Sequence, residues 1–549
     1  MVDVDYLGYP LWIRDPGKIL YPPLPLSVSK VLEGWPVDPD TLIFRLPSEI
    51  LSQIVQDIDK KDLASLALVN SACRQLVRSR QFASVTMNYS EESCEILAQL
   101  MRESKGFLNN ECPRWHLSTR EILSEDDPSR ALGNENDRIG FEEFTLNILS
   151  LIRGPSRLPH LETVEWRNSH DIPIADDYFI DTVTSSSNLR NIVLCNLRTS
   201  KQLSHARQSP STPSQQLQCL FIQNCTFDNE DKADQIRVRD LIRGSSKSLE
   251  TLFWDLEVYY NKSHVQNVQY SLVDDDSPAP VFENLRNLSL KAAFSDVQTW
   301  KCLLAPQLRI LDIRAYAADD LSDQCLQELG HKRNLHTFSW ARSAAKKTSV
   351  PLAFLKANTQ ISRLGLAVEG RGGSKPEHAL EHDVLPLLIH AFQSLTSLQI
   401  FWDGWHLPAA NLEMISQIST LEEIHLGTCS TNWSLDHDVI LNSLGNLAKL
   451  KRIGFSHDEH RMPVFRLLNG DLYFNDDETP LDPGVNPNRV AHDRLEDIAN
   501  SYLAVFQRLE WLAFDNVSFL TSGSVDDGSR RMATANSEIY RHFLDGVFY

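Results

Sequence analysis

A short apolar motif recurs through most of the chain and limits the possible folds more than any other feature. The motif is an apolar residue, a second one three positions later and a third two positions after that, as in LETVEW from Leu161. Because the last two apolar positions are two apart, they share one face of a short strand. The twelve copies start at Leu161, Leu189, Leu217, Leu249, Leu285, Leu308, Leu335, Ile361, Leu395, Leu421, Leu450 and Leu509.

The spacing of the copies indicates a stacked array. Up to Leu450, successive copies start 23 to 36 residues apart, with helical patterns such as Leu321–Gly330 and Asn411–Ser419 between them. This arrangement resembles the leucine-rich repeat, whose units are roughly 20–29 residues long. One strand and one helix cannot close a core alone, so units must stack. The predicted fold class is α/β: a leucine-rich-repeat solenoid with parallel strands on a concave face and helices outside.

One interval departs from this spacing, because Leu450 and Leu509 are 59 residues apart. We expect it to hold either an extra unit or a long insertion around Asp471–Arg489. The polar stretches 206–216 and 261–280 are expected to be loop insertions. The resulting division is an N-terminal extension (1–40), a small helical module (41–88), a helical linker (89–157), the solenoid (158–520) and a C-terminal tail (521–549).

The predicted module in front of the array has helical rather than strand periodicity. Pro47 suits the first turn of a helix, with Glu49 near the positive end of that helix. Asp59 and Asp62 offer a cap for a second helix. Three short helices in about 40 residues make only a marginal core. We therefore expect leftover apolar surface on this module to dock onto a partner.

This segment resembles an F-box. The resemblance rests on Leu46-Pro47, Glu49-Ile50-Leu51, Ile54, Asp62-Leu63, Leu66, Val69-Asn70 and Cys73-Arg74, and on Phe82–Thr86 as the strand that commonly follows. An F-box followed by leucine-rich repeats is similar to the substrate-recognition subunit of a Skp–cullin–F-box ubiquitin ligase. The resemblance implies a non-catalytic receptor without a cofactor, which binds a Skp-type adaptor and through it a cullin. The implied residues that contact the adaptor, or support that contact, are Leu46, Pro47, Ile50, Leu51, Ile54, Leu63, Leu66, Val69 and Leu76.

Two alternatives remain open from the sequence. In the first, the chain is a leucine-rich-repeat scaffold outside any ligase, and the helical module caps the array with Leu46, Ile50 and Leu51 buried against it. In the second, the chain is a metallopeptidase built on HALEH (His378–His382), which matches the H-x-x-E-H zinc motif. Pro386 is expected to end or kink any helix there. A solvated helix face explains that stretch more simply, so no metal site is predicted.

The expected target-binding surface is the concave face of the sheet. The three motif positions point inward, so the residues between and beside them should face solvent. These residues combine both charges with aromatic groups, which protein interfaces favour at their centres. Aromatic side chains there can instead pack on neighbouring strands. The candidate residues are Glu165, Arg167, Phe221, Phe253, Asp255, Arg314, Phe401, His425, Arg452, Trp511 and Asp515.

Composition excludes several other classes. Lys and Arg number 53 and Asp and Glu 73, so the net charge is −20, which disfavours nucleic acid as a partner. No apolar run approaches the roughly 18 residues of a membrane span, and the acidic N-terminus lacks the pattern of a signal peptide. Nine cysteines without paired spacing indicate free thiols in a reducing compartment. We therefore expect a protein of the cytoplasm, the nucleus or both, without a membrane partner.

Overall fold

The described residues form two compact units, one within Pro16–Pro306 and one within Gln307–Tyr549. The computed structural model describes residues 46–47, 50–51, 54–55, 58, 60–69, 73, 77, 84–87, 93–95, 97–98, 114–118, 135–153, 161–167, 182, 189–195, 216–223, 232–255, 271–273, 279–291, 297–315, 320–342, 351–368, 380–402, 408–428, 436–456, 466–468, 471–473, 487–514, 517–522 and 532–535.

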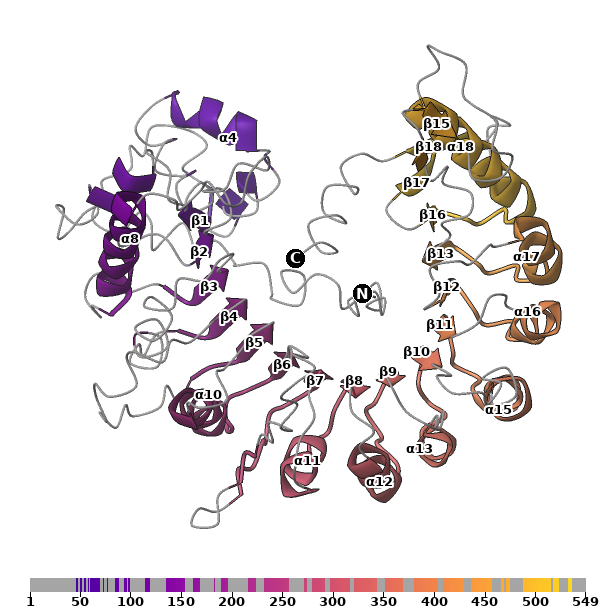
Figure 1. The fold of residues 1–549 in the computed structure, drawn as a ribbon, viewed down its shortest axis with the longest axis horizontal. Helices are drawn as coiled ribbons and strands as arrows, with labels where there is room; N and C mark the ends of the chain where they lie inside the picture. The colour runs from indigo at the N-terminus through magenta and orange to yellow at the C-terminus, as the bar shows by residue number, and fades with distance from the viewer. Residues whose placement is uncertain are drawn as a thin grey trace. The chain divides into compact units, whose positions relative to one another are not determined.

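The first unit is built around a parallel sheet whose strand order follows the chain. Helices α10 and α11 lie on one face of this sheet (Figure 1). Its strands are β1 (Ser84–Met87), β2 (Arg114–Ser118), β3 (Thr163–Arg167), β4 (Asn191–Cys195), β5 (Cys219–Gln223), β6 (Thr251–Asp255) and β7 (Asn287–Lys291). Its helices are α4 (Lys60–Ala67), α8 (Glu135–Arg153), α10 (Lys232–Gly244) and α11 (Val297–Leu304).

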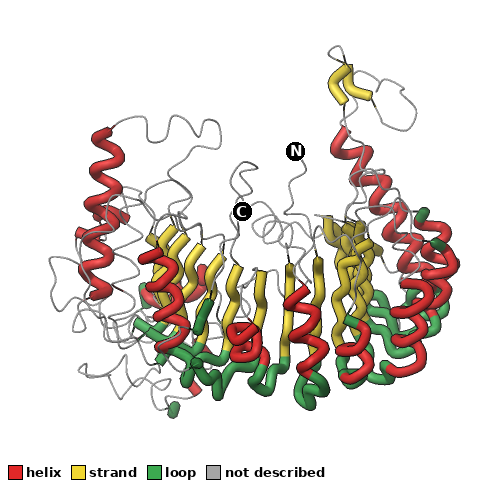
Figure 2. Tube along the Cα trace, turned by 60° about the horizontal axis from the view of Figure 1, so that its bottom comes forward, coloured by secondary structure: helices red, strands yellow, loops and turns green. Residues whose placement is uncertain are grey.

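The second unit has the same two-layer plan, with strands in one layer and helices in the other (Figure 2). Strands β8 to β13 and then β16 pair in parallel. They are β8 (Ile310–Ala315), β9 (Thr337–Arg342), β10 (Arg363–Val368), β11 (Ser397–Trp402), β12 (Glu423–Thr428), β13 (Arg452–Ser456) and β16 (Trp511–Phe514). The helices are α12 (Asp320–Leu329), α13 (Leu352–Ala357), the π-helix η4 (Leu380–Val384), α15 (Leu385–Ala391), α16 (Ala409–Ser416), α17 (His437–Leu444) and α18 (Pro487–Val505). The predicted parallel α/β architecture is confirmed.

The recurring apolar motif forms the buried layer between strands and helices. All twelve leading residues, from Leu161 to Leu509, are at most 2% exposed, and the two apolar residues that follow each are at most 3% exposed. Strand register places equivalent motif positions side by side, as in Ile424 against Ile453 and Leu398 against Ile424. The prediction that these positions point inward is confirmed.

A backbone hydrogen-bond pattern joins successive strands within each unit. The Glu162 carbonyl accepts hydrogen bonds from the N–H groups of Arg190 (2.8 Å) and Asn191 (3.0 Å). The equivalent carbonyl of a later copy, Glu422, accepts from Lys451 (2.8 Å) and Arg452 (3.0 Å). Because one carbonyl fixes two N–H groups of the next copy, the spacing between adjacent strands stays constant although the connecting segments differ in length.

The boundaries predicted at both ends of the array need correction. Strand β2 lies inside the expected helical linker 89–157, and β1 pairs with it, so the parallel sheet begins before residue 158. The sequence contains degenerate copies of the motif there, in which Phe82 and Cys112 occupy the leading position. At the other end, β17 (Val517–Ser522) and β18 (Met532–Ala535) extend the sheet antiparallel into the expected tail. Antiparallel strands of this kind cover the edge that a parallel array leaves open.

The 59-residue interval is an insertion and not an extra unit. Strand β13 pairs directly with β16, so no further parallel strand lies between them. The described part of the interval contains a two-stranded antiparallel hairpin, β14 (Arg466–Leu468) and β15 (Asp471–Tyr473), followed by the long helix α18. The buried His437 of α17 contacts this helix, because its Nδ1 lies 2.9 Å from the Tyr502 hydroxyl.

One cysteine gives a direct check on the packing of the sheet. Cys219 on β5 is buried, and burial, together with the charge of Glu250, raises the pKa of its thiol to about 12. Because iodoacetamide reacts with thiolates, we expect Cys219 to stay unmodified in the folded chain at pH 8.5 and to react after denaturation. Mass spectrometry of the alkylated peptides measures this, with the half-buried Cys302 as the internal comparison. Equal labelling of both cysteines in the folded chain would contradict the packing described here.

Candidate functional site

The helical module begins with a turn that is anchored on a proline. The Pro47 carbonyl accepts hydrogen bonds from the N–H groups of Ile50 (3.0 Å) and Leu51 (3.1 Å). Residues 50–51 and 54–55 are helical, and α4 follows from Lys60 to Ala67. Pro47 therefore starts a helix as predicted, because its missing N–H has no helical partner to lose at that position.

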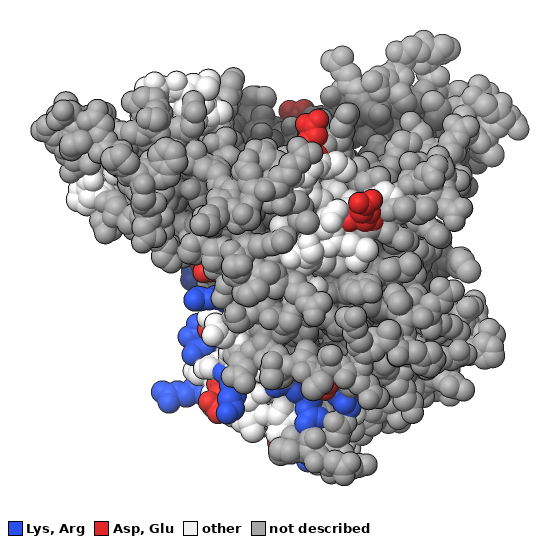
Figure 3. All heavy atoms as spheres, turned by 90° about the vertical axis from the view of Figure 1, so that its left-hand side faces the viewer, with Lys and Arg blue, Asp and Glu red and all other residues white. Residues whose placement is uncertain are grey.

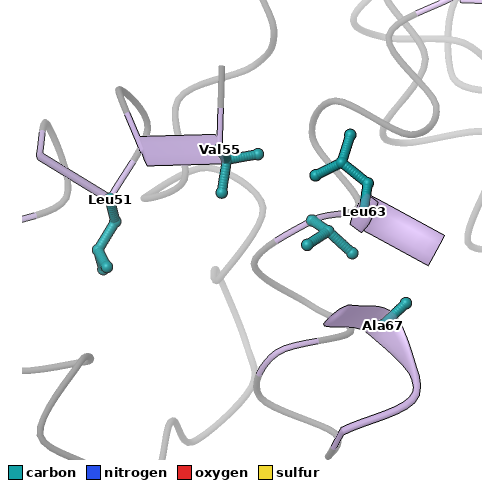
Figure 4. Packing of buried hydrophobic residues seen from close by; sticks show 5 residues of the cluster. Leu51, Val55, Leu63 and Ala67 are labelled. Carbon is teal, nitrogen blue, oxygen red and sulfur yellow. The ribbon is translucent and has the colours of Figure 1, made fainter. Parts of the chain in front are cut away.

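The module has a small apolar core of its own. Leu51, Val55, Leu63, Ala67 and Val77 are buried together, and Ile58 and Leu66 pack against them with partial exposure. Figure 4 shows Leu51 and Val55 on the first helical segment near Leu63 and Ala67 of α4. Five buried side chains make a small core, so the module has little apolar burial to stabilise it alone.

Beside this core, the module exposes an apolar surface. Leu46, Ile50, Leu68 and Val69 are 40%, 43%, 79% and 66% exposed, respectively. These four, here called the apolar surface, are among only seven large hydrophobic residues exposed in the described part of the chain. They lie within 24 residues of sequence (46–69), whereas the other three, Leu146, Val281 and Val505, are scattered. An exposed apolar cluster of this kind is typical of a surface that a partner covers.

The nine predicted adaptor-binding residues differ in their exposure to solvent. Leu46, Pro47, Ile50 and Val69 are exposed, and Ile54 and Leu66 are half-buried. Leu51 and Leu63 are in the module's core, where they can support a surface but not form it. Leu76 lies outside the described residues. Leu68 was not predicted, because Leu63, Leu66 and Val69 are spaced three residues apart and Leu68 does not share that spacing.

The face of the sheet opposite the helices differs from the prediction. Several candidate residues expected to face solvent are buried instead: Glu165, Phe221, Phe253, Phe401 and His425. Among the candidates whose side chains are described, only Arg452 is exposed, and Trp511 is half-buried. Nothing is described for the side chains of Arg167, Asp255 and Arg314, or for Asp515.

Large side chains on this face cover one another, because adjacent strands are only about 4.8 Å apart. The rings of Phe221 and Phe253 stack with centroids 4.0 Å apart. A Cβ on Gly427 would overlap the ring of Phe401, whose centroid is 5.5 Å from that of His425. The expectation that these aromatic residues stand in solvent was therefore wrong, and packing on neighbouring strands is what occurs.

A cluster of three charged side chains lies on this face at the start of strands β10, β12 and β13. Glu423 is buried, and Arg363 Nη2 lies 4.0 Å from Glu423 Oε2, while Arg452 is the strand neighbour of Glu423 on the other side. Burial raises the pKa of the Glu423 carboxyl, and the charges of Arg363 and Arg452 partly oppose that rise. Two arginines thus surround one carboxylate that is costly to keep charged.

The HALEH segment does not provide a metal centre in the part of the chain that the structure describes. No three His, Cys, Asp or Glu side chains there are grouped as metal ligands. His378 lies outside the described residues, and Leu380–Val384 forms a π-helical turn. The π-helix ends at Val384, and Pro386 is the second residue of α15, because proline fits the first turn of a helix, where no helical N–H bond is required.

Charge and hydropathy add no second site. Figure 3 shows Lys and Arg side chains gathered over the lower part of one face with acidic side chains among them. Such a mixture is typical of a solvated surface with weak ion pairs such as that of Arg239 Nε and Asp240 Oδ1, 3.6 Å apart. Among the helices described, none is both long and apolar enough to cross a bilayer.

Comparison with known proteins adds one finding about the module. No curated protein is similar enough to the chain to count as a match. A family match covers residues 43–84, which include the apolar surface, α4 and the first residue of β1. The segment that folds into the helical module with exposed Leu46, Ile50, Leu68 and Val69 matches the F-box domain family.

Proposed function

We propose that this chain is a substrate-recognition subunit of a Skp–cullin–F-box ubiquitin ligase. The observation that carries the proposal is the apolar surface of the F-box segment, which is open to solvent beside a core of only a few buried side chains. F-box domains bind Skp-type adaptors, and burial of each of these four side chains would contribute about 1 kcal/mol. The adaptor in turn would connect the chain to a cullin.

The repeat array is the proposed target-binding part. Its buried motif layer and parallel strands support a leucine-rich-repeat solenoid, an architecture that commonly presents a binding face. The chain would act without catalytic residues of its own. By holding adaptor and target at once, it would raise the local concentration of the target near the ligase's ubiquitin-loaded enzyme.

The alternative, a free-standing scaffold, requires the module to bury its outer face against the array. Leu46 and Ile50 are exposed instead, and Leu51 is buried in the module's own core. These placements favour a docking surface for a separate protein.

Co-expression with a Skp-type adaptor tests the proposal. We expect the full chain and the adaptor to elute together from a gel-filtration column at equal stoichiometry, and the pair to shift again when the cullin is added. A folded chain that elutes alone at micromolar concentration would refute the ligase role and leave the scaffold.

A further inference from the structure

Two polar side chains of β11, Ser397 and Gln399, are buried without a hydrogen-bond partner among the described residues. Each is 2% exposed, and the atoms concerned are Ser397 Oγ and both Oε1 and Nε2 of Gln399. Buried polar atoms in native proteins nearly always form hydrogen bonds, because burial removes their water without replacement. The unpaired carboxamide of Gln399 can donate and accept at the same time.

On the sheet face opposite the helices, the carboxamide of Gln399 lies near the backbone of Gly365, which the Ser339 side chain also approaches. Its strand neighbours are Gly365 on β10 and His425 on β12. A Cβ on Gly365 would lie 3.7 Å from Gln399 Oε1, so the carboxamide lies near the backbone of β10. A Cβ on Gly454 of β13 would overlap the His425 ring, so that ring leans the other way. Gln399 and His425 therefore diverge across β11 and β12.

The charged residues beside Ser397 determine the net charge of this site. Its strand neighbours are Arg363 and Glu423, and the neighbour of Glu423 is Arg452. Arg363 lies 4.0 Å from Glu423, whereas Arg452 is exposed. Two positive charges and one negative charge leave an excess of one positive charge, which favours an acidic ligand.

We propose that Ser397, Gln399, Arg363 and Arg452 bind an extended acidic peptide segment of the target, an inference that rests on the proposed receptor function. Residues two apart on a strand are about 6.6 Å apart, which is also the repeat of peptide groups on one side of an extended chain. One peptide group can pair with the donor and acceptor of Gln399 and the next with the Ser397 hydroxyl. An acidic side chain on the same segment then meets Arg363 and Arg452. Because Ser397 and Gln399 are enclosed in the free chain, the atoms that cover them must move aside, and association is slow.

A peptide array tests this site with defined probes. The full-length chain is applied to twelve-residue peptides that carry Asp or Glu, Lys or Arg, or only Ser and Ala at the varied positions. We expect retention of the acidic set and an affinity about tenfold lower for Gln399→Leu. The same substitution should raise the thermal unfolding midpoint of the free chain, because it removes an unpaired buried amide. Gln417→Leu, at the exposed end of α16, is the matched control and should leave peptide binding unchanged.

The outcomes separate this inference from the ligase role. Equal retention of acidic and basic peptides, or equal affinities of Gln399→Leu and Gln417→Leu, overturns the site. Arg452→Glu alters an exposed side chain and provides a second variant, which must weaken the binding of acidic peptides. Adaptor binding is measured on the same proteins and should be unaffected by all three substitutions. If the wild type binds acidic peptides but does not bind the adaptor, the ligase role is refuted and the peptide site is not.

Discussion

Replacement of Asn358 by alanine is expected to destabilise the second unit by about 3 kcal/mol. Asn358 is fully buried in the loop after α13 and satisfies groups of two successive copies of the repeat. Its Oδ1 accepts from the Lys332 N–H (2.7 Å), and its Nδ2 donates to the carbonyls of Gly330 (3.0 Å) and Phe354 (2.9 Å). Alanine would remove these three bonds and a longer one from Gln360 Nε2 (3.4 Å). It would leave the Lys332 N–H, the most costly of the groups to bury alone, without its acceptor.

Urea unfolding followed by tryptophan fluorescence measures this loss, and hydrogen exchange locates it to the two loops that Asn358 joins. Asn334 is an exposed asparagine in the same region, so Asn334→Ala is the matched control and should change stability by less than about 0.5 kcal/mol. Indistinguishable unfolding midpoints for the two variants would show that Asn358 does not link the copies.

Replacement of Val69 by aspartate is expected to weaken adaptor binding by at least about 100-fold while the chain stays folded. Val69 is 66% exposed in the apolar surface, so a carboxylate there is solvated in the free chain. In the complex the same carboxylate would be buried against apolar groups without a partner. Surface plasmon resonance with an immobilised Skp-type adaptor measures the change.

The chain offers a close control for this experiment. Val281 is also 66% exposed, but it lies outside the F-box segment, so Val281→Asp should bind the adaptor like the wild type. Equal loss in both variants would point to a general charge effect, and no loss in either would remove the apolar surface from the interface.

The buried layer of the array could be predicted from the sequence because its geometry is local. A spacing of three and then two residues sets which side chains share a face, and all twelve copies from Leu161 to Leu509 followed it. Strand β2 was missed, and β1 was expected only as the strand that follows the F-box, because Phe82 and Cys112 replace the leading leucine of the motif there. A search for the apolar pattern rather than for leucine would have found both.

The other face of the sheet could not be predicted in the same way. Whether Phe401 or His425 meets solvent depends on the residue on the next strand, and both lean over glycines, Gly427 and Gly454. Each glycine lies within a copy of the motif on the next strand. The register between strands is needed to see that Gly427 is beside Phe401 and Gly454 beside His425. For the F-box segment, the sequence indicated which residues are apolar, and only the fold separates the core residue Leu51 from the surface residue Ile50.

Hydrogen exchange of the wild-type chain with and without a Skp-type adaptor tests the central claim most directly, because it requires no substitution and reports the position of the interface. The account predicts slower exchange in residues 46–69, which contain the apolar surface, and no comparable change at Val281 or Val505. Unchanged exchange in residues 46–69 at saturating adaptor concentration would contradict the proposed role of the F-box segment.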